Sequence, residues 1–436
     1  MTTDPSKPEI PKPVSFASAV SLGVGTMIGA GIFALLGEAG AIAGSAVWIS
    51  FLIGGGIALL SGYSLGKLGG CYPSAGGIVE YLIQGYGDNV LAGAMSVMMY
   101  LAALVSVSLV AKTFGFYATA LLPGDPPTWT ASIFALGVMV VFVGLNLRGS
   151  ESVARAELVI VVFKFAVLLI LAIGSLTAID PDLLSPSEYQ SPGSILASVA
   201  VTFFAYEGFR VITNAAEDVQ DPERTIPRAI LTAIALVLGL YLLVSVVVFG
   251  VLTTDEVIAA KENALAEAAR PVFGSLGFAA VSVTALVATA SAINASLYAV
   301  TNVTYQMAKD GELPNAFGTP IRHSREGLLI SAAIIAILAV AFDLSQIAVL
   351  GAISILLVHA TVHIGHLRLI DQTRGNPIIV GLAALASLVA MALSIVDASK
   401  RSPTIPIVFV VFIGSAFVVE IALRRSRGRN LKPRIT

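Results

Sequence analysis

Long runs of apolar residues limit what this chain can fold into more than any other feature of its sequence. A helix that crosses a lipid bilayer needs about 20 mainly apolar residues, and twelve segments of this kind follow one another along the 436 residues. Their hydrophobicity is continuous rather than alternating, which predicts helices. The predicted spans are 15–36, 41–66, 90–121, 129–147, 158–178, 194–216, 229–252, 273–307, 327–343, 345–366, 377–396 and 404–423.

The composition leads to the same class of protein. Hydrophobic residues make up 56% of the chain and charged residues only 12%, whereas a soluble domain carries roughly a quarter charged residues. Lipid must therefore solvate most of the surface, and an all-α integral membrane protein is predicted. The net charge of −2 indicates no nucleic-acid partner. The lone Cys71 excludes a disulfide within the chain and a metal motif built on paired cysteines.

The distribution of Lys and Arg predicts the orientation in the membrane. With the N-terminus in the cytoplasm, the outer side holds five of the 25 cations, and two more lie inside predicted spans, which leaves 18 on the cytoplasmic side. The five outer cations are Lys112, Lys261, Arg270, Lys400 and Arg401. Both termini are predicted to be cytoplasmic, with a disordered tail over 1–13 and a basic tail over 424–436. Short loops without a targeting segment indicate a prokaryotic plasma membrane.

The first span is rich in glycine. Residues 23–33 read GVGTMIGAGIF, and each glycine weakens a helix by about 1 kcal/mol relative to alanine. Unwinding here would bare backbone N–H and C=O groups in mid-membrane, which is tolerable only where they face a cavity. The half-helix that starts at Gly29 to Gly31 would then offer N–H donors to an anion. The alternative is that Gly25 and Gly29 serve close helix packing.

The sixth span carries two opposite charges in an apolar run. Glu207 and Arg210 lie three residues apart beside Gly208. A charge at the membrane centre costs at least about 2.5–3.5 kcal/mol on insertion scales and usually marks a functional site. The alternative is that the two side chains pair with each other.

These two spans open two halves of five spans each. Because five is odd, the second half must have the opposite orientation, which is the geometry of an inverted repeat with a binding site between the two breaks. The chain divides into a ten-helix core over 14–368 and two additional spans over 369–423. A carrier of a small solute is predicted. No nucleotide-binding P-loop motif occurs in the sequence, so an ion gradient or exchange must drive uphill movement.

Four segments resemble signature regions of the amino acid–polyamine–organocation transporters. They are GTMIGAGIF at 25–33, YPSAGG at 72–77, the region 203–228 with its DPERTIPR ending, and MAKDGELP at 307–314. The resemblance implies the five-plus-five inverted-repeat (LeuT-type) fold with broken first and sixth helices. It also implies a permease for amino acids or polyamines.

The resemblance also assigns a substrate site at the two breaks. It places the substrate carboxylate at the backbone N–H groups of Gly29, Ala30 and Gly31. An aromatic lid over the substrate falls at Phe204. The backbone carbonyls that would hold the substrate ammonium lie near Thr26, Met27, Phe204, Ala205 and Glu207.

Lys164 in the fifth span is a second buried cation, and burial favours its neutral form. In proton-coupled relatives a lysine here resembles a substitute for sodium, which predicts a proton as the coupling ion and no other cofactor. Its expected partners are the carbonyls of Gly25 and Ile28 with the hydroxyls of Thr289 or Ser291. The alternative is a lysine that extends to the cytoplasmic interface. Sodium coupling and exchange also remain open.

Arg210 departs from the family pattern, because many relatives carry an acid at that position. It is expected to hold either Glu207 or Glu217. Glu207 is also a candidate to recognise a cationic side chain of the substrate, so the sequence leaves the substrate open between amino acids and polyamines.

Three histidines end the tenth span. His359, His363 and His366 share one helical face, which makes them a weak candidate for a metal site, although hydrogen-bonded histidines at an interface are the commoner case. A membrane enzyme and a non-transporting nutrient sensor are remote alternatives. The sequence holds no other catalytic constellation and no long soluble appendage. The predicted partners are an amino acid substrate and the bilayer, and no oligomeric state is predicted.

Overall fold

The computed structural model describes residues 14–148, 153–309, 313–322, 324–401 and 404–427, and helices account for nearly all of them. The predicted tail 1–13 and residues 428–436 of the basic tail lie outside the described residues. The first eight helices are α1 (Phe16–Ala43), α2 (Val47–Cys71), α3 (Ile78–Tyr86), α4 (Val90–Ala120), α5 (Thr130–Arg148), α6 (Val153–Ser175), α7 (Pro192–Tyr206) and α8 (Val211–Asn214). The others are α9 (Pro222–Val251), α10 (Thr254–Ala260), α11 (Ala264–Glu267), α12 (Arg270–Lys309), α13 (Glu326–Ala341), α14 (Leu344–His366), α15 (Ile370–Thr373), α16 (Pro377–Arg401) and α17 (Thr404–Arg427). The strands β1 (Pro320–Ile321) and β2 (Ser324–Arg325) form a small antiparallel hairpin.

Each of the twelve predicted spans overlaps a helix, and the sixth comprises α7, a 3₁₀ turn and α8. Among the described residues, ten helices are long and apolar enough to cross a bilayer, and the bent pair Phe16–Gly29 and Gly31–Ala43 makes an eleventh span. The segment predicted at 327–343 is α13, which has only 16 residues. The chain is a multi-pass, all-α membrane protein.

The outer surface of the bundle is apolar, as lipid contact requires. Leu276 on α12 is 81% exposed, Val140 on α5 is 72% exposed and Ile378 on α16 is 71% exposed. Exposure of large apolar side chains at this level on many helices would favour aggregation in water. It is the expected pattern where hydrocarbon chains are the solvent.

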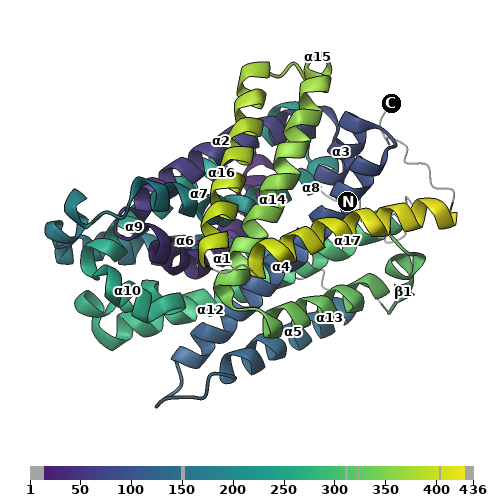
Figure 1. Cartoon of the computed structure of the whole chain (residues 1–436). Coiled ribbons are helices and arrows are strands. Elements are labelled where there is room, and N and C mark those ends of the chain that lie inside the picture. Colours follow the sequence, from purple (N-terminus) through teal and green to yellow (C-terminus); the bar gives the residue numbers. More distant parts are fainter. Residues whose placement is uncertain (1–13, 149–152, 310–312, 323, 402–403, 428–436) are drawn as a thin grey trace, which may run out of the picture.

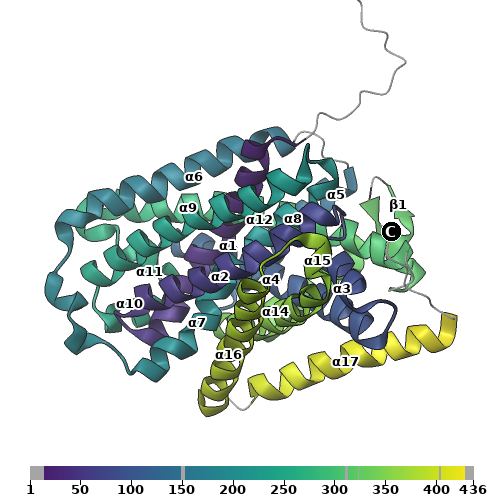
Figure 2. The ribbon, with the colours of Figure 1, turned by 90° about the horizontal axis from the view of Figure 1, so that it is seen from above.

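The helices that open the two predicted halves pack against one another. The first pair, α1 and α2, contacts the second pair, α7 and α9, in every combination. On the other side, α4 packs against α12 and α14. The additional helices lie outside this core, with α16 on α14, α2 and α7 and with α17 on α4 (Figure 1). Figure 2 shows α6 and α17 at opposite edges of the bundle.

Glycines let α2 and α9 approach closely. A Cβ atom on Gly66 would lie 2.8 Å from Cα of Pro227, and one on Gly62 would lie 2.6 Å from Cδ1 of Ile234. Lipid gives helices no hydrophobic drive to associate, so close packing at small residues holds such pairs together.

Two cations outside the cavity have structural partners. Lys112 of α4 donates to the carbonyls of Ala339 and Phe342, which lie at the C-terminal end of α13 where a cation is favoured. Arg424 of α17 pairs with Asp88 at 2.5 Å and with Glu420 at 2.6 Å. This second group ties α17 to the loop that precedes α4.

Candidate functional site

A cavity lies between the two helices predicted to break. It encloses about 970 Å³ of empty space, part of it open to solvent, and its walls come from α1, α4, α12, the sixth span and the loop before α3. Gly31 of α1, Gly76 of the loop before α3 and Asn214 at the end of α8 all contribute to the wall.

The break in the first span is a bend and not an unwound stretch. The axes of Phe16–Gly29 and Gly31–Ala43 differ by 44°, while both parts remain helical. The expectation of bared backbone through Gly25 to Gly31 is therefore wrong in this conformation. Four glycines weaken the helix locally, but the surrounding helices hold it wound.

The sixth span changes its geometry at Glu207. The α-helix α7 ends at Tyr206, a 3₁₀ turn covers Glu207–Arg210, and the short helix α8 completes the span. The N–H of Glu207 donates to the carbonyl of Phe204 in a three-residue step. The tighter turn shifts the hydrogen-bond register of the chain, and 3₁₀ stretches inside helices often mark hinges or functional sites.

The two breaks touch each other through their backbones. A Cβ atom on Gly208 would overlap the backbone nitrogen of Met27, and one on Gly31 would overlap the carbonyl oxygen of Ala205. Glycine is required at both positions because no side-chain carbon fits between the chains. The small residues at the breaks thus bring α1 and the sixth span into direct contact.

Tyr241 of α9 bridges the two breaks and was missed in the sequence. Its hydroxyl lies 2.6 Å from the carbonyl oxygen of Met27 and 3.4 Å from that of Ala205. These are two of the carbonyls assigned to the substrate ammonium. A carbonyl oxygen has two lone pairs, so it can accept from this hydroxyl in addition to a helical N–H. A lone tyrosine in an apolar span gives no signal in the sequence that would reveal this role.

Most of the predicted substrate residues line the cavity. Thr26, Met27, Gly31, Phe204, Ala205 and Glu207 are all in its wall. Gly29 instead packs against the methyl group of Ala292 on α12. The surroundings of Ala30 lie outside the described residues. The ring of Phe204 packs against Gly351 of α14, where a Cβ atom would lie 2.5 Å from its Cζ.

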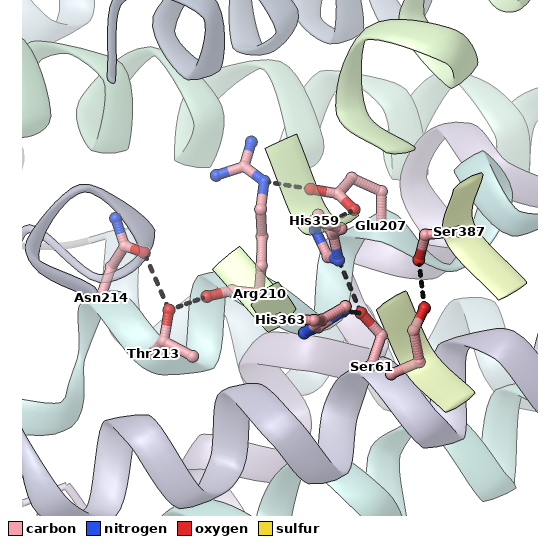
Figure 3. Close-up of polar contacts among 9 residues, drawn as sticks. Ser61, Glu207, Arg210, Thr213, Asn214, His359, His363 and Ser387 are labelled. Carbon is pink, nitrogen blue, oxygen red and sulfur yellow. Dashed lines mark hydrogen bonds and ion pairs between the residues drawn. The ribbon is translucent and has the colours of Figure 1, made fainter. Parts of the chain in front are cut away.

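Glu207 and Arg210 pair with each other, as the structural alternative proposed. Nε of Arg210 lies 2.6 Å from Oε1 of Glu207, and Nε2 of His359 lies 3.2 Å from Oε2 (Figure 3). Glu207 is only 4% exposed. Arg210 therefore holds Glu207 and not Glu217, which is exposed on the turn after α8. A buried carboxylate needs such partners to offset the loss of water.

The three histidines form a hydrogen-bonded series and not a metal cluster. All are buried, and they bond through Ser61 and Ser64 of α2 and through Thr373 of α15. Within the described parts of the chain, no group of three or more His, Cys, Asp or Glu side chains is arranged to hold a metal ion. The helical spacing predicted the shared face, but the serines that separate the ring nitrogens come from another helix.

Lys164 is fully buried between α6 and the first span. Its ammonium donates to the carbonyl of Gly25, which is one of the contacts expected from the sequence. The alternative in which it extends to the interface is wrong. The hydroxyl of Thr289 donates to the carbonyl of Ala285 in its own helix, which leaves its lone pairs free to accept. The other two expected partners, Ile28 on α1 and Ser291 on α12, are both buried.

The glycine-rich segment after α2 closes against the end of the sixth span. Gly77 has a φ of +51°, and a Cβ atom there would lie 2.6 Å from Oδ1 of Asn214. Both the left-handed backbone and the lack of space require glycine. This explains physically why YPSAGG accompanies the sixth-span segment in the sequence.

Comparisons with known proteins agree with this geometry. A family model described as amino acid permease matches residues 14–421. The inner membrane transport protein YbaT of Escherichia coli is 36% identical over 82% of this chain and 84% of its own. The methylthioribose transporter of Bacillus subtilis is 30% identical, and the serine/threonine exchanger SteT of the same species is 25% identical, each over 70% of both chains.

Proposed function

The chain belongs to the amino acid permease family and is a membrane transporter rather than an enzyme, and we propose that it is a proton-coupled symporter of amino acids. It would work by alternating access in a prokaryotic plasma membrane, with both termini in the cytoplasm. The coupling ion would be the proton, with no other cofactor.

The cavity between the two breaks is the observation that carries the proposal. Its wall joins residues 26, 27 and 31 of the first span to residues 204, 205, 207 and 208 of the sixth. A zwitterion needs both donors and acceptors, and the breaks of two spans are where backbone groups of both kinds can turn toward a ligand. The wound state of α1 would belong to a conformation without substrate. Binding would then open the bend at Ala30.

The buried lysine supports proton coupling over sodium coupling. The Lys164 ammonium already occupies the carbonyl of Gly25, where a sodium ion would seek oxygen ligands. Loss of its proton would remove that contact and release the first span. Release of one proton per cycle would therefore be linked to the bend of α1.

The cavity wall supports a cytoplasm-facing conformation. Gly76, Asn214 and Val303 contribute to it, and all three lie toward the ends of spans that the Lys and Arg bias assigns to the cytoplasm. The described state would be the one that releases substrate inside.

Uptake into proteoliposomes tests the proposal. Purified protein is supplied with a mixture of the twenty ¹⁴C-labelled L-amino acids under an inward proton gradient, an inward sodium gradient or neither. We expect accumulation only with the proton gradient, abolished by a protonophore. Uptake that follows sodium and ignores the proton gradient would refute the coupling, and the absence of uptake in every arm would refute amino acid transport.

Exchange is a second candidate, favoured by the similarity to a protein named as a serine/threonine exchanger. The same vesicles distinguish it. An exchanger takes up label only when unlabelled amino acids are loaded inside, whereas a symporter also fills empty vesicles.

A further inference from the structure

A continuous series of hydrogen bonds runs from the cavity wall through α2 and α14. Ser61 Oγ lies 2.6 Å from Nδ1 of His359 and 2.7 Å from Nε2 of His363. Ser64 Oγ lies 2.8 Å from Nδ1 of His363 and 2.8 Å from Nδ1 of His366. The series ends where Nε2 of His366 meets the hydroxyl of Thr373 at 2.9 Å. At the other end, His359 contacts Glu207 (Figure 3).

Each member of this series can both donate and accept. A neutral imidazole has one N–H and one bare nitrogen, and a hydroxyl donates one proton and accepts others. If Glu207 is ionised, the Nε2–H tautomer of His359 suits the 3.2 Å ion-pair contact with Oε2, which falls outside hydrogen-bond geometry. Every further bond can then run in the same direction. The donors in order are Thr373, His366, Ser64, His363, Ser61 and His359. For this order the hydroxyl of Thr373 must turn from the carbonyl of Leu369, its acceptor at 3.0 Å, toward Nε2 of His366. In this arrangement every bond of the series has one donor and one acceptor.

The series is shielded from water along its length. His359, His363, Ser61 and Ser64 are fully buried. The rings of Phe203 and Phe209 flank the imidazole of His359 edge-on, with centroids 5.5 and 5.9 Å away. Beyond Thr373 the chain reaches the surface, since Gln372 and Arg374 are exposed. A buried hydrogen-bonded path is what transfer of a proton between the surface near α15 and the cavity needs.

Few charges act on the series from the packed elements. Lys67 of α2 acts electrostatically on His366, and Glu207 pairs with Arg210. The other charged or titratable groups on the elements around α14 are Glu38 on α1, Tyr63 and Cys71 on α2, Glu80, Tyr81 and Tyr86 on α3, Tyr100, Lys112 and Tyr117 on α4, Tyr206 on α7, Arg368 before α15, Asp371 on α15, Asp397, Lys400 and Arg401 on α16, and Glu420, Arg424 and Arg425 on α17.

We propose that Thr373, His366, Ser64, His363, Ser61 and His359 form a proton relay that connects the surface near α15 with the carboxylate of Glu207 in the cavity wall. The inference rests on the proposed function, because it supplies a route for the coupled proton. It adds a second titrating centre, separate from Lys164.

A proton moves along the relay from one group to the next. Thr373 takes a proton from a hydronium ion, which becomes water, and passes its own proton to Nε2 of His366, whose Nδ1 proton moves to Ser64. Ser64 passes its proton to Nδ1 of His363, and Nε2 of His363 passes one to Ser61. Ser61 protonates Nδ1 of His359, and the Nε2 proton of His359 neutralises Oε2 of Glu207. Run in reverse, the relay releases the proton of Glu207 at the surface.

Neutralising Glu207 changes the cavity. The Oε1 atom that faces Arg210 loses its negative charge, so the ion pair at 2.6 Å weakens. Arg210, which lines the cavity, then becomes available to an anionic group. The relay thus links the arrival of a proton to the charge that a substrate meets.

Two transport modes test the relay. Net uptake driven by a proton gradient requires proton transfer, whereas counterflow of amino acids at equal pH does not. With the twenty ¹⁴C-labelled L-amino acids as probe, Ser61→Ala and His363→Gln should lower gradient-driven accumulation about tenfold or more. Counterflow should stay within about twofold of wild type, because the substrate site is intact. Ser387→Ala is the matched control, since its buried hydroxyl donates only to Ala383 of its own helix.

A structural role gives a different result. If Ser61 and His363 only hold α2 to α14, gradient-driven uptake and counterflow decrease together or neither changes. Either outcome overturns the relay. Wild-type protein that fails in both modes refutes the proposed function instead.

A second measurement needs no transport. In a His323→Gln background, ¹⁵N NMR of the purified protein reports the tautomers of the three remaining histidines. The relay requires each to be neutral and the tautomers to follow one direction. These are Nε2–H on His359 and His363 with Nδ1–H on His366, or the complete reverse. A doubly protonated His363 or a mixed order interrupts the series and overturns the inference, whatever the protein transports.

Discussion

Lys164 and Glu207 are both charged groups buried beside a break, and the protein stabilises them in different ways. Lys164 donates to a backbone carbonyl inside the glycine-rich part of α1. Glu207 is surrounded by side chains, with Arg210 on one oxygen and His359 on the other. A charge held by backbone acts on the shape of a helix when it titrates. A charge held by side chains passes its proton on and leaves the helix in place.

The largest effect is expected at Glu207. Glu207→Gln removes the carboxylate between Arg210 and His359, and breaking a buried pair costs about 3 kcal/mol or more. If a cost of this size falls on the transport cycle, the rate of amino acid uptake into proteoliposomes decreases roughly a hundredfold. Glu217→Gln is the control, because that acid is exposed. A Glu207→Gln variant with the wild-type rate would show that the pair is not needed and would erase the contrast with Lys164.

A different kind of loss is expected at Lys164. Lys164→Met keeps the apolar stem and removes the ammonium, so the carbonyl of Gly25 loses its donor. Amino acid accumulation should no longer respond to an imposed proton gradient, with a decrease of about tenfold, while counterflow persists. Lys309→Met, at the exposed end of α12, should behave as wild type. Unchanged proton dependence in Lys164→Met would remove the lysine from coupling.

Tyr241→Phe sharpens the comparison, because it removes a hydroxyl that serves both breaks. The carbonyl of Met27 loses a donor at 2.6 Å, and one hydrogen bond contributes about 1 kcal/mol. We expect a decrease of about fivefold in uptake rate, with proton dependence retained. Tyr117→Phe is a suitable control, since its hydroxyl donates over 3.4 Å to Phe33 elsewhere on α1. Equal losses in both variants would mean that the bridge between the breaks has no special role.

The smallest effect concerns a pair of acids outside the spans. Burial raises the pKa of Glu262 from its ordinary value of 4.5, so its charged form destabilises the fold and stability falls as pH rises above about 4.5. Hydrogen bonds from Thr253 lower the pKa of Glu256, so its contribution is present at neutral pH and lost on acidification. At pH 7 Glu262→Gln should raise the thermal unfolding temperature in detergent slightly, and Glu256→Gln should lower it. Shifts of the same sign would contradict this.

The spans could be predicted from the sequence because membrane insertion depends on local composition. Long apolar runs place α4 and α14 to within one residue, whereas α2 begins six residues later than predicted. The segment that became α13 was predicted equally well, although its 16 residues are short for a span. The Gly-rich first span and the Glu207 to Arg210 region were also identified, because both violate the usual content of a membrane helix.

The site was only partly predictable, because its contacts join residues far apart in the chain. The sequence places three histidines on one face, but nothing local shows that Ser61 and Ser64 come between them. Tyr241 gives no signal at all. The wound state of α1 was also missed, since glycine content reports how easily a helix opens and not whether it is open in a given conformation.

The touching backbones at Gly208 and Met27 have a mechanical consequence. A contact without intervening side chains has no slack, so a tilt of the inner part of α1 must push the turn at Glu207 at once. The two spans then move together about that contact. A methyl group added at residue 208 would push the two backbones apart and block this joint motion, even if every polar group around the cavity were left unchanged.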